Sequence, residues 1–404
     1  MKWIEELGQR IDKRWLAASY SEDALCEIAA EALATTEGSP EFFREVTAWG
    51  LGDHVLPVQT DIDGMFGQPP LVVYVNPMQT FYIQALVWLD STTSVHQHGF
   101  SGAFKVVEGQ SVHARYAFTP SDPVSSRMVF GALAYRDAEV LVRGDVRAIE
   151  HGTKLIHSVF HLDRPSVTLV VRTFGDGGKG PQYDYLRPWL AVDPYYKSPR
   201  LQRNLQILAA IREVDRPRYI ETLVQMIPTT DLYTSYRYLH QYYETSARSD
   251  ERATMAALVR ATHRERGDKL VACLDNVLHD GFLIAKRKQL RDPDHRFFIA
   301  LLLNVPDRDS ILRLVGARYP GDPVDHVVRW IAELCDGTTA PLLPLSESTL
   351  HALKSMARGS TLEGVVSDFR ERYDDAGVLA QVDQIAALYD LLRTSSHFKP
   401  IFLQ

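Results

Sequence analysis

A series of short apolar runs between residues 67 and 174 constrains the fold of this chain most strongly. The runs are rich in Val, Phe, Tyr and Thr, and glycine, proline or aspartate residues separate them. They cover residues 71–75, 81–89, 94–98, 103–107, 111–118, 139–142 and 167–173. Many short strands at close spacing are typical of an antiparallel sandwich or barrel. We therefore predict an α+β fold in which an antiparallel β-barrel or jelly roll lies between helical flanks.

Helical patterns flank the barrel segment on both sides. The N-terminal stripe consists of Trp3, Leu7, Ile11 and Trp15, which recur at the spacing of one helix face. Residues 175–181 form a glycine-rich linker, and helical periodicity continues from there to the end of the chain. We expect an N-terminal helical segment at residues 1–66, a barrel at 67–178 and a large all-α domain at 179–404.

Charge and cysteine usage narrow the class of protein. The net charge of −7 gives no basic excess that would point to nucleic acid. The three cysteines are odd in number and far apart, which argues against a disulfide framework and for a reducing compartment. The N-terminus lacks a secretory pattern, and no apolar window approaches the ~18 residues of a membrane span. We expect a cytoplasmic protein that binds neither nucleic acid nor membranes.

A histidine pair lies on one predicted strand and is the most informative motif. His96 and His98 are two residues apart, so their side chains project from the same face of a strand. Neutral imidazole is a common ligand of zinc, iron, copper and nickel. A strand and a turn at Gly109 follow the pair, and a later segment carries Gly152 and His157.

This order resembles the two motifs of the cupin superfamily. The first cupin motif has the histidine pair and a glycine that closes the next hairpin. The second has a glycine turn, a metal-binding histidine and a polar residue four positions later. The matching positions are His96, His98, Gly109, Gly152, His157 and His161. The resemblance covers residues 67–175 and implies a cupin barrel that holds one metal ion on His96, His98 and His157.

The ligand set resembles the three-histidine branch of cupins that includes the cysteine dioxygenases. Many cupins add a glutamate four or five residues after the histidine pair, but Gly102 and Ala103 stand there in this chain. We expect these small residues to leave room beside the ion. The resemblance implies a mononuclear iron(II) oxygenase whose open positions take substrate and O₂. Zinc, nickel, manganese and copper stay open as alternatives, and zinc would favour hydrolysis or isomerisation.

The strand after the third histidine departs from that branch. Cysteine dioxygenases carry Ser, His and Tyr there on alternate positions, whereas this chain has Thr168, Val170 and Arg172. Cysteine is therefore not the expected substrate. We predict that Arg172 faces inward and grips a small anionic substrate, because a guanidinium binds a carboxylate through two parallel hydrogen bonds. The rival prediction pairs Arg172 with Asp176 at the barrel rim.

Other polar residues complete the candidate site. Tyr82 and Gln84 lie nearest to the position from which the family's arginine grips its substrate, and we include both as catalytic candidates with His161. We expect His161 to be a hydrogen-bonding neighbour of the ion rather than a fourth ligand. For His113 there are two interpretations, a side chain that points into the barrel and a surface or core residue, and we favour the second. The basic run at residues 286–291 is interpreted as a solvated helix face.

Two classes of function follow from these residues. The first is an enzyme, a non-heme iron oxygenase that acts on a small anionic molecule. The second is a non-catalytic ligand-binding or sensory cupin, in which the helical domain transmits occupancy to a partner or forms a homodimer. The sequence shows no helix-turn-helix signature after the barrel that would indicate a transcription factor.

Overall fold

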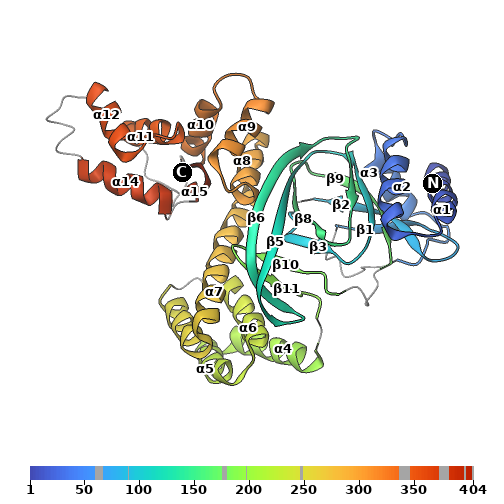
Figure 1. Ribbon diagram of the computed structural model, residues 1–404, viewed down its shortest axis with the longest axis horizontal. Coiled ribbons are helices and arrows are strands. Elements are labelled where there is room, and N and C mark those ends of the chain that lie inside the picture. Colours follow the sequence, from blue (N-terminus) through green and yellow to red (C-terminus); the bar gives the residue numbers. More distant parts are fainter. Residues whose placement is uncertain are drawn as a thin grey trace.

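The computed structural model places a central β structure between two groups of helices (Figure 1). It describes residues 1–59, 67–89, 91–174, 180–196, 198–245, 249–335, 346–372, 382–394 and 397–402. Most of the predicted glycine-rich linker, including Asp176, lies outside the described residues. Within the described part, no helix combines the length and the apolar character needed to cross a membrane.

The N-terminal segment forms helices that cover one sheet. Their bounds are α1 Lys2–Ala17, α2 Glu22–Ala34 and α3 Phe42–Gly50. The predicted stripe exists, and Leu7, Ile11 and Trp15 are at most 3% exposed. These side chains share a hydrophobic core with Ile83 and Leu169, which project from the outer face of the five-stranded sheet. Burial of this face fixes the N-terminal helices on the β structure.

The β structure consists of two antiparallel sheets. The first has the strand order β1 (Pro70–Val75), β2 (Phe81–Trp88), β9 (Ser166–Thr173), β4 (Gly102–Glu108) and β7 (Val146–Ile149). The second closes on itself in the order β10 (Asp184–Leu186), β11 (Leu190–Val192), β6 (Met128–Leu141), β5 (Ser111–Ser125), β8 (Gly152–His161) and β3 (Val95–His98). The predicted α+β fold with an antiparallel barrel is thereby confirmed.

Several strands differ from the sequence prediction. The β5–β6 hairpin is longer than predicted. Its outer half contains Pro120, Asp122 and Pro123, and the sequence did not indicate strand there because these residue types are depleted in strands. The expectation of continuous helix after the linker is wrong for β10 and β11, which complete the barrel. Each of these two strands has only three residues, too few to show an alternating pattern.

The remainder of the described chain is helical. The helices are α4 Pro199–Val214, α5 Arg216–Met226, α6 Leu232–Thr245, α7 Ser249–Gln289, α8 Pro293–Asn304, α9 Arg308–Arg318, α10 Pro323–Cys335, α11 Glu347–Ala357, α12 Leu362–Arg372, α14 Val382–Thr394 and α15 Lys399–Phe402. A short 3₁₀ turn, Ile227–Thr229, follows α5. Helix α7 is interrupted at Arg264, where φ is 54°.

The helical region packs against the closed sheet along α7, α8 and α9 (Figure 1). The Tyr116 hydroxyl on β5 donates to the Asn304 carbonyl at the end of α8 over 2.7 Å. Arg187, just after β10, donates to both carboxylate oxygens of Asp280 on α7, each at 2.7 Å. Apolar residues of β5, β8 and α8 form one continuous core. The helical region is therefore attached to the outer surface of the strands that form the candidate site.

Candidate metal centre

Strands β3 and β8 bring three buried histidines together inside the barrel. His96 and His157 are direct cross-strand partners in the antiparallel register, and His98 lies two residues further along the same face of β3. The three ring centroids are 4.8 Å apart in every pairing. Each side chain offers one ring nitrogen such that all three nitrogens lie within 4.8 Å of one another. The histidines predicted from the sequence therefore converge.

Burial keeps the three imidazoles neutral. Desolvation lowers the pKa of His96, and it lowers the pKa of His98 and of His157 well below the usual value. Mutual repulsion between the three rings lowers the pKa of His98 and His157 further. Neutral imidazoles have the lone pairs that a metal ion requires. The cluster is thus ready to bind a cation near neutral pH.

Hydrogen bonds fix the direction in which two of the rings present their lone pairs. His96 Nδ1 lies 2.9 Å from the Ser94 carbonyl oxygen, which can only accept. His96 therefore carries its proton on Nδ1, which places the ring lone pair on Nε2. His157 Nδ1 lies 2.8 Å from Nε2 of His113. A metal-ligating histidine is commonly oriented in this way through its outer nitrogen.

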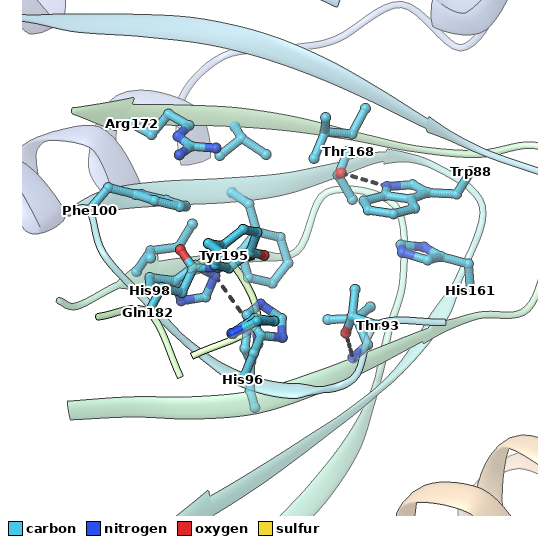
Figure 2. A pocket seen from close by; sticks show the side chains of 17 residues that line it. Trp88, Thr93, His96, His98, Phe100, His161, Thr168, Arg172, Gln182 and Tyr195 are labelled. Carbon is cyan, nitrogen blue, oxygen red and sulfur yellow. Dashed lines mark hydrogen bonds between the residues drawn. The ribbon is translucent and has the colours of Figure 1, made fainter. Parts of the chain in front are cut away.

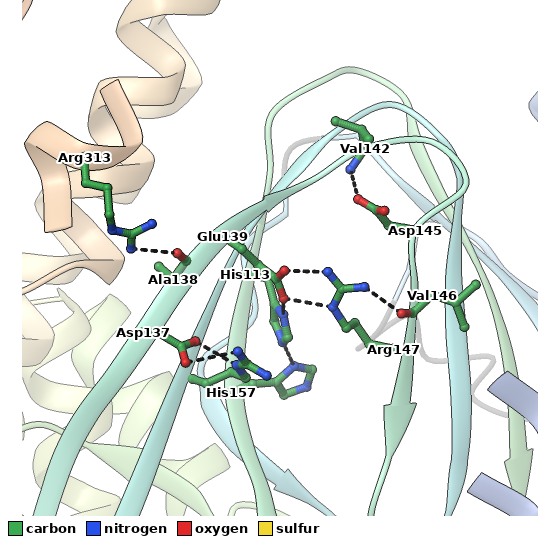
Figure 3. A network of polar contacts seen from close by, with 11 residues as sticks. His113, Asp137, Ala138, Glu139, Val142, Asp145, Val146, Arg147, His157 and Arg313 are labelled. Atoms are coloured by element: carbon green, nitrogen blue, oxygen red, sulfur yellow. Dashed lines mark hydrogen bonds and ion pairs between the residues drawn. The ribbon is translucent and has the colours of Figure 1, made fainter. Parts of the chain in front are cut away.

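The contact of His157 with His113 continues to the barrel surface (Figure 3). His113 Nδ1 lies 3.1 Å from a carboxylate oxygen of Glu139 on β6, and Arg147 on β7 donates to the same carboxylate. Because the carboxylate accepts the proton of His113 Nδ1, Nε2 of His113 accepts from His157 Nδ1. His157 Nε2 is left with its lone pair toward the other histidines.

The spacing of one pair of inner nitrogens fits two ligands of one ion. Nε2 of His98 and Nε2 of His157 lie 3.4 Å apart. Two imidazoles on one ion at about 2.0–2.1 Å place their nitrogens roughly 3.0–3.4 Å apart in octahedral or tetrahedral geometry. Nδ1 of His98 is buried and has no hydrogen-bond partner among the described residues. A cation between Nε2 of His98 and Nε2 of His157 would take the lone pairs that these two nitrogens present to each other.

The histidines open into a pocket of about 400 Å³ between the two sheets (Figure 2). Thr168, Val170 and Arg172 alternate along β9 and all line it. The remaining lining residues are Leu86, Trp88, Thr93, His96, His98, Phe100, Phe104, Ile149, His157, Val159, His161, Gln182, Pro194 and Tyr195. A small cavity with a few convergent polar groups is typical of a ligand site.

Arg172 brings a positive charge to this pocket. Its guanidinium carbon lies 3.7 Å from the centre of the Phe100 ring and 5.3 Å from that of Tyr82. The charge contributes to the lowered pKa of His98, after desolvation and after His96. Asp176, the rival partner of Arg172 in the sequence prediction, is outside the described residues.

The other catalytic candidates occupy different positions. Neither Tyr82 nor Gln84 is among the described residues that line the pocket. Both are buried on β2, opposite Arg172 and Val170 of β9, respectively. His161 does line the pocket, but it is not part of the histidine cluster.

The expectation that Gly102 and Ala103 leave room beside the ion is wrong. A Cβ atom on Gly102 would lie 1.9 Å from the Val171 carbonyl oxygen, because β4 approaches the backbone of β9 there. Ala103 is fully buried in the core under the N-terminal helices. Phe104, which follows on β4, borders the pocket instead. Gly102 therefore serves the contact between two strands, and Ala103 the packing of the N-terminal helices on the sheet.

Some residues of the site were missed by sequence reasoning. His113 is 1% exposed and contacts a candidate ligand, whereas the prediction favoured a surface or core residue without a role in the site. Trp88 stacks on His161. Gln182 and Tyr195 lie beside β10 and β11, the strands that were not predicted, and their side chains are 3.3 Å apart. No local motif marks these two residues.

Comparison with known proteins leaves the family of the chain open. No family model and no curated protein matches the sequence. A solved structure of DMSP lyases is 14% identical, with a TM-score of 0.23, over 43% of this chain and 95% of that chain. Recombinant oxalate oxidase in complex with glycolate is 14% identical, with a TM-score of 0.21, over 42% and 80% of the two chains. The capsular polysaccharide assembling protein CapF from Staphylococcus aureus is 18% identical, with a TM-score of 0.18, over 30% and 33%. These values are too low to assign a function.

Proposed function

We propose that this chain is a metal-dependent enzyme of the cupin type that acts on a small anionic substrate. The observation that carries the proposal is the cluster of His96, His98 and His157, three buried neutral imidazoles that open into a pocket with Arg172 on its wall. We favour iron(II) and an oxygenase reaction, on the resemblance to the three-histidine cupins. A zinc ion on the same residues would make the protein a hydrolase or isomerase.

The residues around the cluster have separate tasks in this proposal. A divalent ion bound there would supply Lewis acidity and, if it is iron(II), redox chemistry at its open positions. Arg172 would bind the substrate carboxylate through two parallel hydrogen bonds and orient the molecule. Phe100, Phe104 and Val170 would keep bulk water from the reacting atoms, which strengthens every charge interaction inside the pocket.

A non-catalytic sensory protein is the second candidate. It is favoured by two buried arginines of the helical region that reach the strand carrying His157. Arg287 at the end of α7 donates to the His161 carbonyl, and Arg296 on α8 donates to the Leu162 carbonyl at 2.9 Å. A change in the pocket could reach the helices through these contacts.

Metal content and O₂ consumption separate these candidates. The purified protein is analysed for bound metals, reconstituted with iron(II) or zinc(II), and mixed with small carboxylic acids, thiols and aromatic acids. The oxygenase proposal expects O₂ uptake only with iron(II) and only with an acid. Turnover with zinc(II) would support hydrolysis or isomerisation. If an acid binds tightly but is not turned over by the iron(II) protein or by the zinc(II) protein, the sensory function is favoured.

A further inference from the structure

One end of the pocket, which we call the His161 subsite, consists of Trp88, Thr93, His161 and Thr168 (Figure 2). The rings of Trp88 and His161 are stacked, with centroids 4.4 Å apart and planes inclined by 13°. The Trp88 indole donates to the Thr168 hydroxyl over 2.9 Å. His161 is 1% exposed and Thr168 is 4% exposed. The subsite is therefore a buried part of the pocket in which Trp88 contacts both His161 and Thr168.

The hydrogen bonds of His161 assign its proton to the nitrogen that remains unpaired. Nδ1 lies 3.0 Å from the Ser111 hydroxyl and 3.2 Å from the Ser166 hydroxyl. Ser166 can donate to the Glu108 carbonyl, but Nδ1 is the only acceptor for Ser111 among the described residues. A buried hydroxyl without an acceptor is costly, so Ser111 donates to Nδ1. Nε2 therefore carries the proton, and it has no partner in the described part of the chain.

The imidazole of His161 donates this hydrogen bond as a neutral group. Burial lowers the pKa of His161 well below its usual value, and the nearby Arg287 guanidinium lowers it further. A neutral donor complements a carbonyl or hydroxyl oxygen without adding a charge. In the proposed function the carboxylate lies against Arg172, which is four residues from Thr168 on β9. That spacing is about 13 Å along a strand.

The two threonines also have hydrogens left to donate. The Thr168 hydroxyl accepts from Trp88, and the Thr93 hydroxyl accepts from the Val159 amide over 2.8 Å. Neither hydroxyl donates a hydrogen bond to a protein group in the described part of the chain. Both residues line the pocket. No acidic side chain occurs among the described residues of the pocket lining. The subsite thus offers hydrogen-bond donors and lacks a charged acceptor.

We infer that the His161 subsite binds a second, uncharged oxygen of the substrate, so that the substrate is a small oxo- or hydroxy-carboxylic acid. This inference depends on the proposed function, because the carboxylate of the same molecule is taken to lie against Arg172. The carbonyl or hydroxyl oxygen would accept from His161 Nε2 and from the threonine hydroxyls. A plain fatty acid of equal length would leave these buried donors unpaired.

Matched pairs of acids test the inference by isothermal titration calorimetry on the metal-loaded full chain. The probes are hexanoate with 5-oxohexanoate and pentanoate with 4-oxopentanoate. We expect the better-fitting oxo acid to bind about tenfold tighter than its partner, as one good hydrogen bond allows. In His161→Phe this preference should vanish, while the affinity for the plain acid changes less than about twofold. His151→Phe, outside the pocket, is the control and should keep the preference.

Nitrogen NMR of the labelled protein gives a readout that needs no variant and no turnover. The ¹⁵N shifts of His161 should show a proton on Nε2 and a free lone pair on Nδ1, and 5-oxohexanoate should shift Nε2 more than hexanoate does. A proton on Nδ1, or equal affinity for both members of each pair, overturns the inference and leaves the proposed function standing. Failure of all four acids to bind overturns the inference and the carboxylate-binding role of Arg172, whereas metal content tests the rest of the proposed function.

Discussion

His113 Nε2 lies 2.8 Å from His157 Nδ1, and its other nitrogen lies 3.1 Å from the Glu139 carboxylate. Two imidazoles in series with a carboxylate can adopt only one set of tautomers while all the hydrogen bonds are kept. The result is that His157 presents a lone pair to His96 and His98. Glu139, on the outer part of the barrel, therefore determines how a buried ligand is oriented.

Replacing Glu139 with Gln should weaken metal binding by about 10- to 100-fold, the usual effect of losing an outer partner of a ligating histidine. The reason is that an amide can donate to His113 Nδ1 and so allow the wrong tautomer. Competition with a chelator measures the dissociation constant. The matched control is Asp137→Asn on the same strand, because Asp137 pairs with Arg115 and does not contact His113. Equal affinity in wild type and Glu139→Gln would disprove this role.

Arg172→Lys should raise the KM of an acid substrate by about 10- to 100-fold, the value of a hydrogen bond to a charged group. Lysine keeps the charge but lacks the planar fork that holds both carboxylate oxygens. The metal content of the variant should equal that of the wild type, because Arg172 is not in the histidine cluster. Steady-state kinetics and metal analysis on one preparation test both parts. Unchanged kinetics would remove Arg172 from the substrate site.

Asp184 should make stability fall as the pH rises. This residue on β10 is the cross-strand partner of His96, and burial raises its pKa to about 6 despite a hydrogen bond from Ser94. The unfolded value is about 3.9, so the folded state holds an extra proton between these two values. Its stabilising contribution is present below about pH 4 and is lost as the pH rises through about 6. The free energy of unfolding falls by up to about 3 kcal/mol over this range.

Urea unfolding of wild type and Asp184→Asn at several pH values tests this shift. Asparagine cannot ionise, so the variant should be the more stable protein at about pH 8, and the difference should disappear near pH 4. Subtracting the two curves removes the contribution of all other groups. A difference that does not depend on pH would show that Asp184 titrates normally.

Arg287 should be essential for attachment of the helices to the barrel. Its side chain is fully buried, its guanidinium carbon lies 4.0 Å from the centre of the Phe160 ring, and it donates to the His161 carbonyl. Arg287→Met should lower the free energy of unfolding by about 2–4 kcal/mol, since the carbonyl loses a charged donor. The exposed Lys288 provides the control variant Lys288→Met, which should stay within about 0.5 kcal/mol of wild type. Equal stabilities of the two variants would contradict this role.

The sequence predicted the barrel and the histidine cluster because both have local signatures. Alternating apolar runs indicate strands, and a histidine pair on one strand fixes a shared face. His157 could be assigned only through its resemblance to a family motif. The α1 stripe was equally clear, since Leu7, Ile11 and Trp15 follow one helix face and are buried together.

Features that depend on contacts distant in the chain could not be predicted. His113 and Glu139 are partners only because β5 and β6 form a hairpin with that register. Arg287 stands in a basic run typical of a solvated helix face, yet it is buried because α7 ends against β8; for this residue the interpretation was wrong. The strands β10 and β11 are too short for any pattern, although they place Gln182 and Tyr195 on the pocket.

The metal content of the histidine variants is the decisive measurement for the proposed metal centre. Five proteins are purified in parallel: wild type, His96→Ala, His98→Ala, His157→Ala and the control His161→Ala. Each is checked for folding by circular dichroism and analysed by inductively coupled plasma mass spectrometry. We predict about one divalent ion per chain in wild type and in the control, and almost none in the three ligand variants. A wild type that binds no metal when it is supplied, or ligand variants that keep the wild-type amount, would contradict the account.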